Sequence, residues 1–189
     1  MWFFFIVGMT GSERANLVRE CLVKLSDIGV RVTFVTCDEP SCNFGMFKEL
    51  GADIDVLTLK SWFPHPSNVD QKVFVLSDAC HMLKLARNTL ASQNIIDEDD
   101  RKISWIYIKK LHELQHDQAL RAGNRLRKAH VEWEKQKMKV RLAAQTLSAN
   151  VAESLQFCME DLKLADFADA GATIKYIRKF DRLFHILTR

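Results

Sequence analysis

Two aspartates follow predicted strands, at points where open α/β sheets usually place their functional sites. Asp38 comes after a β-branched and aromatic run over residues 30–35, and Asp78 comes after the apolar run 73–76. Carboxylates that converge from neighbouring strands can hold divalent metal ions for phosphoryl transfer. Asp78 also suits the N-cap of a helix that starts at Ala79, a role that needs no metal. The residues alone leave Asp38 as a metal ligand or a turn residue, and they favour the helix cap for Asp78.

A second candidate site is the H-E-x-x-H pattern of His112, Glu113 and His116 on a predicted helix. This spacing places both histidines on one helix face, as in zinc peptidases, and Glu132 or Glu134 could supply a third ligand. A five-residue pattern also arises by chance, and its surroundings are strongly basic, which disfavours a bound cation. A zinc peptidase is therefore a minor alternative.

Positive charge is concentrated in one part of the chain. Residues 101–142 contain 12 Lys and Arg and four Asp and Glu, whereas residues 1–90 contain nine and ten. Such a basic stretch can face the phosphates of a nucleotide or of DNA, or it can be a solvated helix face. The glycines at 8 and 11 do not form a Walker phosphate-binding loop, because the lysine and the glycine spacing of that motif are missing.

The elements that must position these residues divide the chain into two parts. Hydrophobic periodicity predicts an α/β part up to about residue 90 and a mainly α part after it. In the first part we expect strands over 2–7, 30–35 and 73–76, a loop over 61–66, and helices after the capping box of Thr10 and Glu13, over 44–50 and from Ala79. In the second part we expect an acidic connector over 97–100 with no strand after it, and helices over 103–122, 124–142, 143–163 and after Gly171.

Composition limits the classes of protein to which the chain can belong. Its 189 residues allow one domain or two small ones, and 48% hydrophobic with 27% charged residues excludes a disordered or coiled-coil chain. The apolar run 2–7 is too short for a membrane span and has no positive flank, so we expect no membrane partner. Five cysteines without a C-x-x-C pair favour a reduced, intracellular compartment.

Three strings together resemble P-element-type DNA transposases, which include the THAP-domain transposases of animals. The strings are GSERANLV leading to TCDEPSCN, then FVLSDACHMLKLARN, and then KMKVRLAAQTLS. The family also has a tryptophan-led helix with a Leu-His pair, similar to the segment from Trp105 to Gln115, which explains the zinc-like pattern as an accident. The resemblance covers nearly the whole chain.

The resemblance implies a partial RNase H-like sheet over residues 1–95 and an all-helical GTP-binding insertion domain, itself truncated, over residues 96–189. In that family an Asp-Asp-Glu set binds Mg²⁺ for DNA strand cleavage and transfer. Asp38 matches the second catalytic aspartate and would be the metal ligand. Asp78 matches an Asp-x-x-His motif that lies outside the catalytic three.

For the GTP site, the resemblance implies that Arg125 contacts the phosphates, with Arg127 and Lys128 as near substitutes. His185 stands where the family has an aspartate that recognises guanine, in a motif that reads Phe-Asp-x-Leu-Phe-Asp. A neutral histidine cannot accept two hydrogen bonds from the N–H groups of the base. We therefore expect weak guanine selectivity.

The family's first catalytic aspartate would precede Met1 and its last glutamate would follow Arg189. We therefore expect a transposase fragment that is inactive alone, with one side of its sheet incompletely covered and poor solubility. The resemblance also implies transposon-end DNA and further copies of the chain as partners, and the nucleus as its location. A domesticated nucleic-acid-binding module is the alternative.

Overall fold

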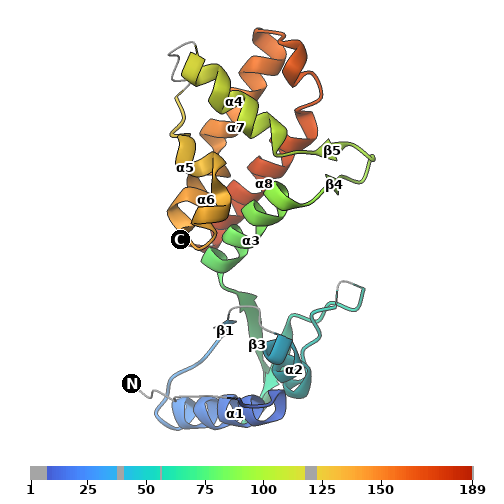
Figure 1. The fold of residues 1–189 in the computed structure, drawn as a ribbon. Helices are drawn as coiled ribbons and strands as arrows, with labels where there is room; N and C mark the ends of the chain where they lie inside the picture. Colours follow the sequence, from blue (N-terminus) through green and yellow to red (C-terminus); the bar gives the residue numbers. More distant parts are fainter. Residues whose placement is uncertain (1–7, 38–40, 56, 118–122, 189) are drawn as a thin grey trace. The chain divides into compact units, whose positions relative to one another are not determined.

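A computed structural model of the protein describes residues 8–37, 41–55, 57–117 and 123–188. The chain divides into two compact units, residues 1–78 and residues 79–189 (Figure 1). This division lies at the start of a helix, upstream of the boundary expected at residue 95. The strand predicted over 2–7 and the candidate ligand Asp38 both lie outside the described residues.

The first unit consists of a three-stranded sheet and two helices that pack against it. Its elements are α1 (Gly11–Asp27), β1 (Phe34–Cys37), α2 (Ser41–Leu50), β2 (Trp62–His65) and β3 (Asn68–Ser77). The strand order is β1-β3-β2, with β1 parallel and β2 antiparallel to β3 (Figure 1). The parallel pair brings the carboxyl ends of β1 and β3 together, as the α/β prediction requires.

The first helix begins and ends where the sequence predicts. Thr10 Oγ1 accepts a hydrogen bond from the Glu13 N–H at 3.3 Å, and the Thr10 N–H donates to the Glu13 carboxylate at 2.8 Å. This capping box satisfies N–H groups that have no partner inside the helix. Gly29 follows the helix with a φ of +80°, a conformation that glycine adopts without strain.

The loop predicted over residues 61–66 is wrong, because residues 62–65 form β2. The two prolines of this segment suggested a break in regular structure. β2, however, is an edge strand, where Pro64 can sit without removing a hydrogen bond from the centre of the sheet. The ladder is irregular between Pro64 and His65, where the register with β3 shifts.

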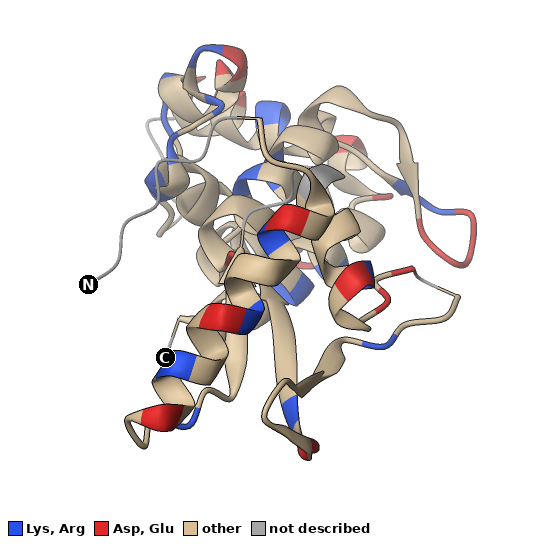
Figure 2. Cartoon of the chain, turned by 90° about the horizontal axis from the view of Figure 1, so that it is seen from below, with Lys and Arg blue, Asp and Glu red and all other residues tan. Residues whose placement is uncertain are grey.

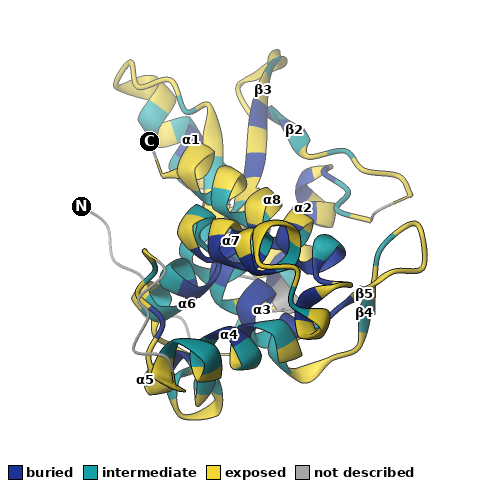
Figure 3. Ribbon diagram, turned by 90° about the horizontal axis from the view of Figure 1, so that it is seen from above, coloured by how far each residue is buried: buried dark blue, intermediate teal, exposed yellow. Residues whose placement is uncertain are grey.

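One face of the sheet is covered and the other is exposed. Val73 and Val75 of β3 are buried against the two helices, together with Phe63 of β2. On the opposite face Phe34 is 56% exposed and Phe74, its partner in the parallel register, is 45% exposed. Figure 3 shows the resulting alternation of buried and exposed bands along β3. Among the described residues, one face of this sheet is therefore apolar and partly exposed, and the prediction that missing strands leave it uncovered stays a prediction.

The second unit is mainly helical. Its elements are α3 (Ala79–Ser92), β4 (Ile95–Ile96), β5 (Lys102–Ile103), α4 (Ile106–Asp117), α5 (Lys128–Val131), the 3₁₀-helix η1 (Trp133–Gln136), α6 (Val140–Thr146), α7 (Ala149–Gln156), the π-turn η2 (Phe157–Asp161), the 3₁₀-helix η3 (Ala165–Phe167) and α8 (Gly171–Leu187). The helices predicted from Ala79 and after Gly171 are confirmed. No described helix is long and apolar enough to cross a membrane.

The single helix predicted over residues 124–142 is wrong. This stretch contains α5, η1 and the start of α6, separated by irregular turns. The fully buried Arg87 of α3 donates from Nη2 to the carbonyl oxygens of Gln136 and Lys137, at 3.0 and 3.1 Å. The Gln136 carbonyl also accepts from the Lys139 N–H at 3.0 Å, which closes a short turn. The contact of both carbonyls with a side chain from a distant helix cannot be foreseen from local periodicity.

The acidic run 97–100 is the turn of a small hairpin rather than a bare connector, so the expectation that no strand follows it is wrong. β4 and β5 pair antiparallel on either side of it. Arg101 forms ion pairs with Asp97, at 2.8 Å, and with Asp99. The turn is the red loop at the right of Figure 2.

The core of the second unit joins α3, α4, α6, α7 and α8. Its fully buried members include Ile108, Leu111, Val151, Leu155 and Ile177. Figure 3 shows these helices with dark blue inner faces and yellow outer faces. The core holds the N-terminus of α7 and one face of α8 in fixed positions, and the candidate site lies between them.

Candidate functional site

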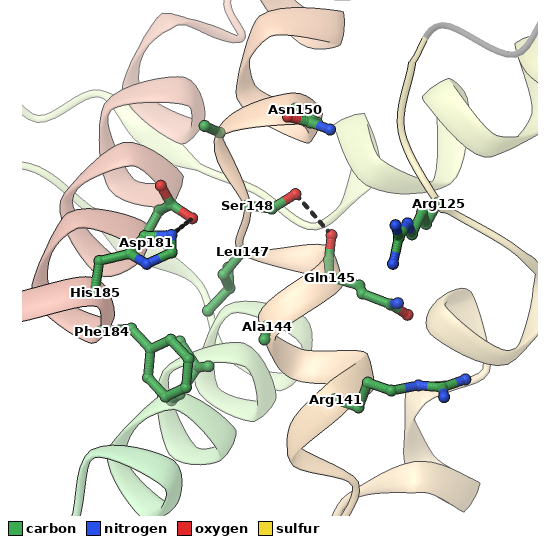
Figure 4. Close-up of a pocket in the computed structure, with 12 residues that line it drawn as sticks. Arg125, Arg141, Ala144, Gln145, Leu147, Ser148, Asn150, Asp181, Phe184 and His185 are labelled. Carbon is green, nitrogen blue, oxygen red and sulfur yellow. Dashed lines mark hydrogen bonds and ion pairs between the residues drawn. The ribbon is translucent and has the colours of Figure 1, made fainter. Parts of the chain in front are cut away.

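A cavity of about 470 Å³, here called the first cavity, lies entirely within the second unit. It is bounded by α6, the start of α7, the end of α8 and the segment before α5 (Figure 4). Its lining residues include Arg125, Arg141, Gln145, Ser148, Asn150, Asp181, Phe184 and His185. Two of the predicted site residues, Arg125 and His185, therefore lie in one cavity although 60 positions separate them.

One side of the first cavity is basic. Arg125 and Arg141 are exposed, and neither side chain has an ion pair or hydrogen bond among the described residues. In Figure 4 the Gln145 side chain extends toward the side on which both arginines lie. Unpaired guanidinium groups, each a fixed fork of N–H donors, are suited to bind phosphate.

The start of α7 adds backbone donors to this cavity. The Ser148 hydroxyl donates to the Gln145 carbonyl at 3.0 Å, so it does not cap the helix that follows. The first N–H groups of a helix have no acceptor within it, and here they belong to Ala149 and Asn150, both lining residues. An uncapped helix N-terminus beside two arginines suits an anion.

The opposite wall is formed by α8 and is chemically different. His185 lies 3.7 Å from the carboxylate of Asp181, one turn earlier, and Phe184 lies beside them. The Asp181 side chain is 22% exposed, whereas the His185 side chain is 67% exposed. A carboxylate can accept hydrogen bonds from two N–H groups of a base, and an aromatic ring can stack on it.

Arg127 and Lys128 do not line the first cavity. Arg127 lines an adjoining cavity of about 410 Å³, here called the second cavity, together with Arg125 and Arg141. Lys128 lies in a third depression, which Arg127 also lines, and its ammonium group is 3.5 Å from the Glu132 carboxylate. Of the predicted phosphate contacts, the structure therefore places Arg125 in the first cavity, Arg127 beside it and Lys128 away from it.

The sequence reasoning missed four contributions to this site: Arg141, Gln145, Asp181 and the start of α7. Asp181 had a sequence indication, because it forms the first half of the Phe-Asp-x-Leu-Phe motif and lies four residues before His185 on one helix face. Arg141 was counted in the basic stretch without a specific role. Gln145 lies in the string KMKVRLAAQTLS, but nothing in that string indicated a role for it, since only tertiary packing brings it to the cavity.

The H-E-x-x-H pattern does not form a metal site in the described residues. No three His, Cys, Asp or Glu side chains in the described ranges gather around a common point. His116 is 80% exposed, and Glu132, a suggested third ligand, lies 3.5 and 3.6 Å from the ammonium groups of two lysines. The zinc interpretation therefore has no support from geometry.

The carboxyl ends of β1 and β3, where the sequence predicted a Mg²⁺ ligand, do not form a metal site in the described residues either. The Asp78 N–H donates to the Cys37 carbonyl at 2.8 Å, which fixes the two strand ends side by side. Asp38 follows directly but lies outside the described residues, and the described carboxylates do not converge there. The donor set for Mg²⁺ is incomplete in the described part of the chain, and no catalytic step through a metal follows from it.

Two family models match the chain in separate parts. Residues 80–189 match the TNP-like, GTP-binding insertion domain, and residues 1–51 match the TNP-like, RNase H N-terminal domain. The first match begins one residue after the start of α3, close to the division between the two structural units.

Two curated relatives and one solved structure are similar to most of the chain. The human DNA transposase THAP9 is 32% identical over 184 residues, which are 97% of this chain and 20% of that protein. The Drosophila melanogaster transposable element P transposase is 28% identical over 159 residues, 84% of this chain and 20% of that protein. The chain thus spans about a fifth of the length of these curated relatives.

The solved structure is described as the Drosophila P element transposase strand transfer complex. It matches with a TM-score of 0.77 and 26% identity, over 90% of this chain and 37% of that chain. The GTP-binding insertion model alone covers more than half of the sequence, and the RNase H model covers its beginning. The chain therefore belongs to the P-element-like transposase family, with an RNase H N-terminal part followed by a GTP-binding insertion domain.

Proposed function

We propose that residues 79–189 bind a guanine nucleoside triphosphate in the first cavity and serve as the nucleotide-binding module of a DNA transposase. The observation that carries the proposal is the polarity of this cavity. Arg125 and Arg141 lie on one side with the uncapped start of α7, and the Asp181 carboxylate lies on the other. The two ends of a nucleotide have the complementary chemistry: anionic phosphates and a base with N–H donors.

The chemistry of the lining residues fits each part of the ligand. The guanidinium groups and the N–H groups of Ala149 and Asn150 would bind phosphate oxygens. Asp181 would accept from the N–H groups of the base, and Phe184 would stack on its ring. A volume of about 470 Å³ lies within the range of ligand pockets.

Base selectivity is expected to be weak, because His185 replaces one of the two aspartates of the family motif. Asp181 alone would recognise the base, and its carboxylate lies beside the His185 ring at 3.7 Å. Competition between GTP and ATP tests this directly. We expect a small preference for GTP in the unchanged chain, a larger one in His185→Asp, and none in Asp181→Asn. A strong preference for GTP in the unchanged chain would contradict the role given to His185.

We infer that this chain does not cut DNA by itself. Two-metal phosphoryl transfer needs several converging carboxylates, and the resemblance assigns only Asp38 of this sequence to the catalytic set. Transposon DNA, further copies of the chain, Mg²⁺ and a nuclear location are proposed for the protein on the strength of its relatives. Magnesium-dependent nicking of plasmid DNA by the purified chain, lost in Asp38→Ala, would contradict this proposal.

The arginine cluster also favours a second candidate function, the binding of nucleic acid without chemistry. Arg125, Arg127 and Arg141 are exposed, and their side chains have no acidic partner among the described residues. When arginines neutralise DNA phosphates, counterions are released, so the affinity of the protein for DNA falls steeply as the salt concentration rises. Salt-sensitive DNA binding that GTP does not displace would favour this function over a nucleotide site.

A further inference from the structure

The second cavity adjoins the first and has no acidic residue in its lining. Arg125, Arg141 and Gln145 line both cavities, while Arg127 and His130 line the second but not the first. Arg127 also lines the third depression. None of the three guanidinium groups has an ion pair among the described residues. Three like charges that face one space repel one another, so this arrangement favours a ligand with several negative charges and disfavours a metal cation.

A buried histidine fixes the orientation of the one amide shared by the two cavities. His130 is only 2% exposed, and its Nδ1 accepts a hydrogen bond from the backbone N–H of Arg127 at 3.0 Å. The Arg127 carbonyl oxygen lies farther from Nδ1, at 3.3 Å. The shorter contact makes Nδ1 the acceptor and puts the ring proton of the neutral histidine on Nε2. Nε2 lies 3.0 Å from Gln145 Oε1 and donates to it.

Burial also lowers the pKa of His130, and this effect exceeds the opposing effect of the hydrogen bond to Gln145. The neutral ring is therefore the stable form in the fold. With Oε1 of Gln145 bound to His130, its NH₂ group is the part of the amide left for another partner. That group is a neutral donor set between two arginines, in a position suited to a phosphate oxygen (Figure 4).

We propose that the second cavity binds the distal phosphates of the nucleotide, with Arg127 and the Gln145 NH₂ group as ligands and His130 as the residue that positions Gln145. The inference rests on the proposed function, because the first cavity must hold the base and the proximal phosphate. It assigns different phosphates to different residues. Arg125, Arg141 and Gln145, which line both cavities, contact the ligand in every phosphorylated form, whereas Arg127, which of the two cavities lines only the second, distinguishes long phosphate chains from short ones.

The test measures dissociation constants of the full chain for guanosine, GMP, GDP and GTP by titration calorimetry at fixed ionic strength. The unchanged chain is expected to bind more tightly as phosphates are added. Gln145→Glu keeps an acceptor for His130 Nε2 but replaces the NH₂ group with an anionic oxygen. It should weaken GTP binding by roughly tenfold or more and leave guanosine binding within about twofold.

Arg127→Gln should likewise weaken GTP and GDP binding more than GMP binding. Two matched variants control for net charge: Lys179→Gln removes an exposed positive charge on α8, and Gln93→Glu adds a negative charge after α3. Neither residue lines the two cavities. Both controls should change GTP affinity by less than about twofold, because exposed charges are screened by salt and solvent.

The positioning role of His130 has its own readout. In His130→Phe the amide of Gln145 is no longer held, so the ratio of GTP to guanosine affinity should fall toward that of Gln145→Ala, while the melting temperature reports any general loss of fold. If His130→Phe and Gln145→Ala change only the melting temperature and leave the ratio of GTP to guanosine affinity unchanged, His130 has only a structural role and the proposal is wrong.

The remaining outcomes separate this inference from the proposed function. If the unchanged chain binds none of the four ligands, the nucleotide function itself fails. If it binds GMP and GTP equally, the first cavity holds the nucleotide and the second cavity does not hold its phosphates. If Arg127→Gln and Gln145→Glu weaken DNA binding but not GTP binding, the second cavity is a DNA-phosphate site, and the inference is overturned.

Discussion

The side chain of His130 shows how one buried polar residue ties the site to the stability of the second unit. It is almost inaccessible to solvent, and both ring nitrogens have hydrogen-bond partners, the Arg127 N–H and the Gln145 side chain. Protonation would break the hydrogen bond from the Arg127 N–H to Nδ1, although the Arg127 carbonyl oxygen also lies 3.3 Å from Nδ1. It would also place a positive charge in a buried position near Arg87 and Arg127, so the fold favours the neutral ring.

This preference gives a pH dependence with a definite sign. Burial lowers the pKa of His130 in the folded state, so the unfolded chain binds more protons than the folded chain at pH values just below the ordinary histidine pKa of about 6.5. The stability of the second unit should therefore be full above that pH and fall as the pH is lowered toward the folded-state pKa. Urea unfolding of the chain at pH 7.5, 6.5 and 5.5 measures this, and His130→Gln should flatten the slope. A stability that rises as the pH is lowered would contradict it.

At the scale of elements, Arg87 joins two segments that are distant in sequence. It is fully buried on α3, donates through Nη2 to the carbonyls of Gln136 and Lys137, and donates through Nε to the Asn88 side chain at 2.7 Å. Burial lowers the pKa of its guanidinium. No carboxylate among the described residues pairs with it, so backbone carbonyls solvate the charge in place of water.

Replacement of this arginine should destabilise the second unit. Arg87→Met keeps much of the volume but removes a buried donor from both carbonyls, and the Gln136 oxygen then keeps only its hydrogen bond from the Lys139 N–H. We expect a loss of about 2–4 kcal/mol in the free energy of unfolding. Thr89→Ala, at an exposed position on the same helix, is the control and should change stability little. Urea denaturation followed by circular dichroism measures both variants, and equal stability of Arg87→Met and the unchanged chain would contradict this account.

The same elements show what the sequence could predict. Local chemistry was sufficient for α1, where Thr10 and Glu13 cap the start, and for the strand that ends at Ser77. It failed where tertiary contacts decide the structure. Pro64 suggested a loop but is tolerated at the edge of the sheet, and the stretch bound by Arg87 had helical periodicity without being one helix.

The candidate site shows the same division. Arg125 was predicted by its position in the resemblance and His185 through a family motif, and both line the first cavity. Gln145 and the open start of α7 could not be predicted, because their roles depend on how Ser148 bonds to the preceding turn and on the position of His130. Asp38 stays a prediction, since it lies outside the described residues.

At the scale of the whole molecule, we expect the exposed apolar face of the first unit to govern the solubility of the chain. Phe34 and Phe74 are partners in the parallel register, and Leu76 on the same face is 38% exposed. Contiguous apolar surface of this kind marks an interaction site or an aggregation risk.

Polar substitution on this face should improve solubility without loss of fold. We expect the double variant Phe34→Thr and Phe74→Thr to remain monodisperse at concentrations at which the unchanged chain scatters light, because threonine keeps strand propensity while removing apolar surface. Size-exclusion chromatography with light scattering measures this. Leu57→Thr, which changes a 92% exposed side chain away from the face, serves as the control. Equal association of the double variant and the unchanged chain would contradict the role of this face.

The central claim is that the first cavity binds a nucleoside triphosphate through Arg125. The most direct measurement is the GTP dissociation constant of the full chain and of Arg125→Ala, with Lys179→Gln as the matched control for charge. We predict saturable binding by the unchanged chain, a loss of roughly tenfold or more in Arg125→Ala, and little change in the control. Absence of saturable GTP binding in the unchanged chain, or equal affinity in Arg125→Ala, would contradict the claim.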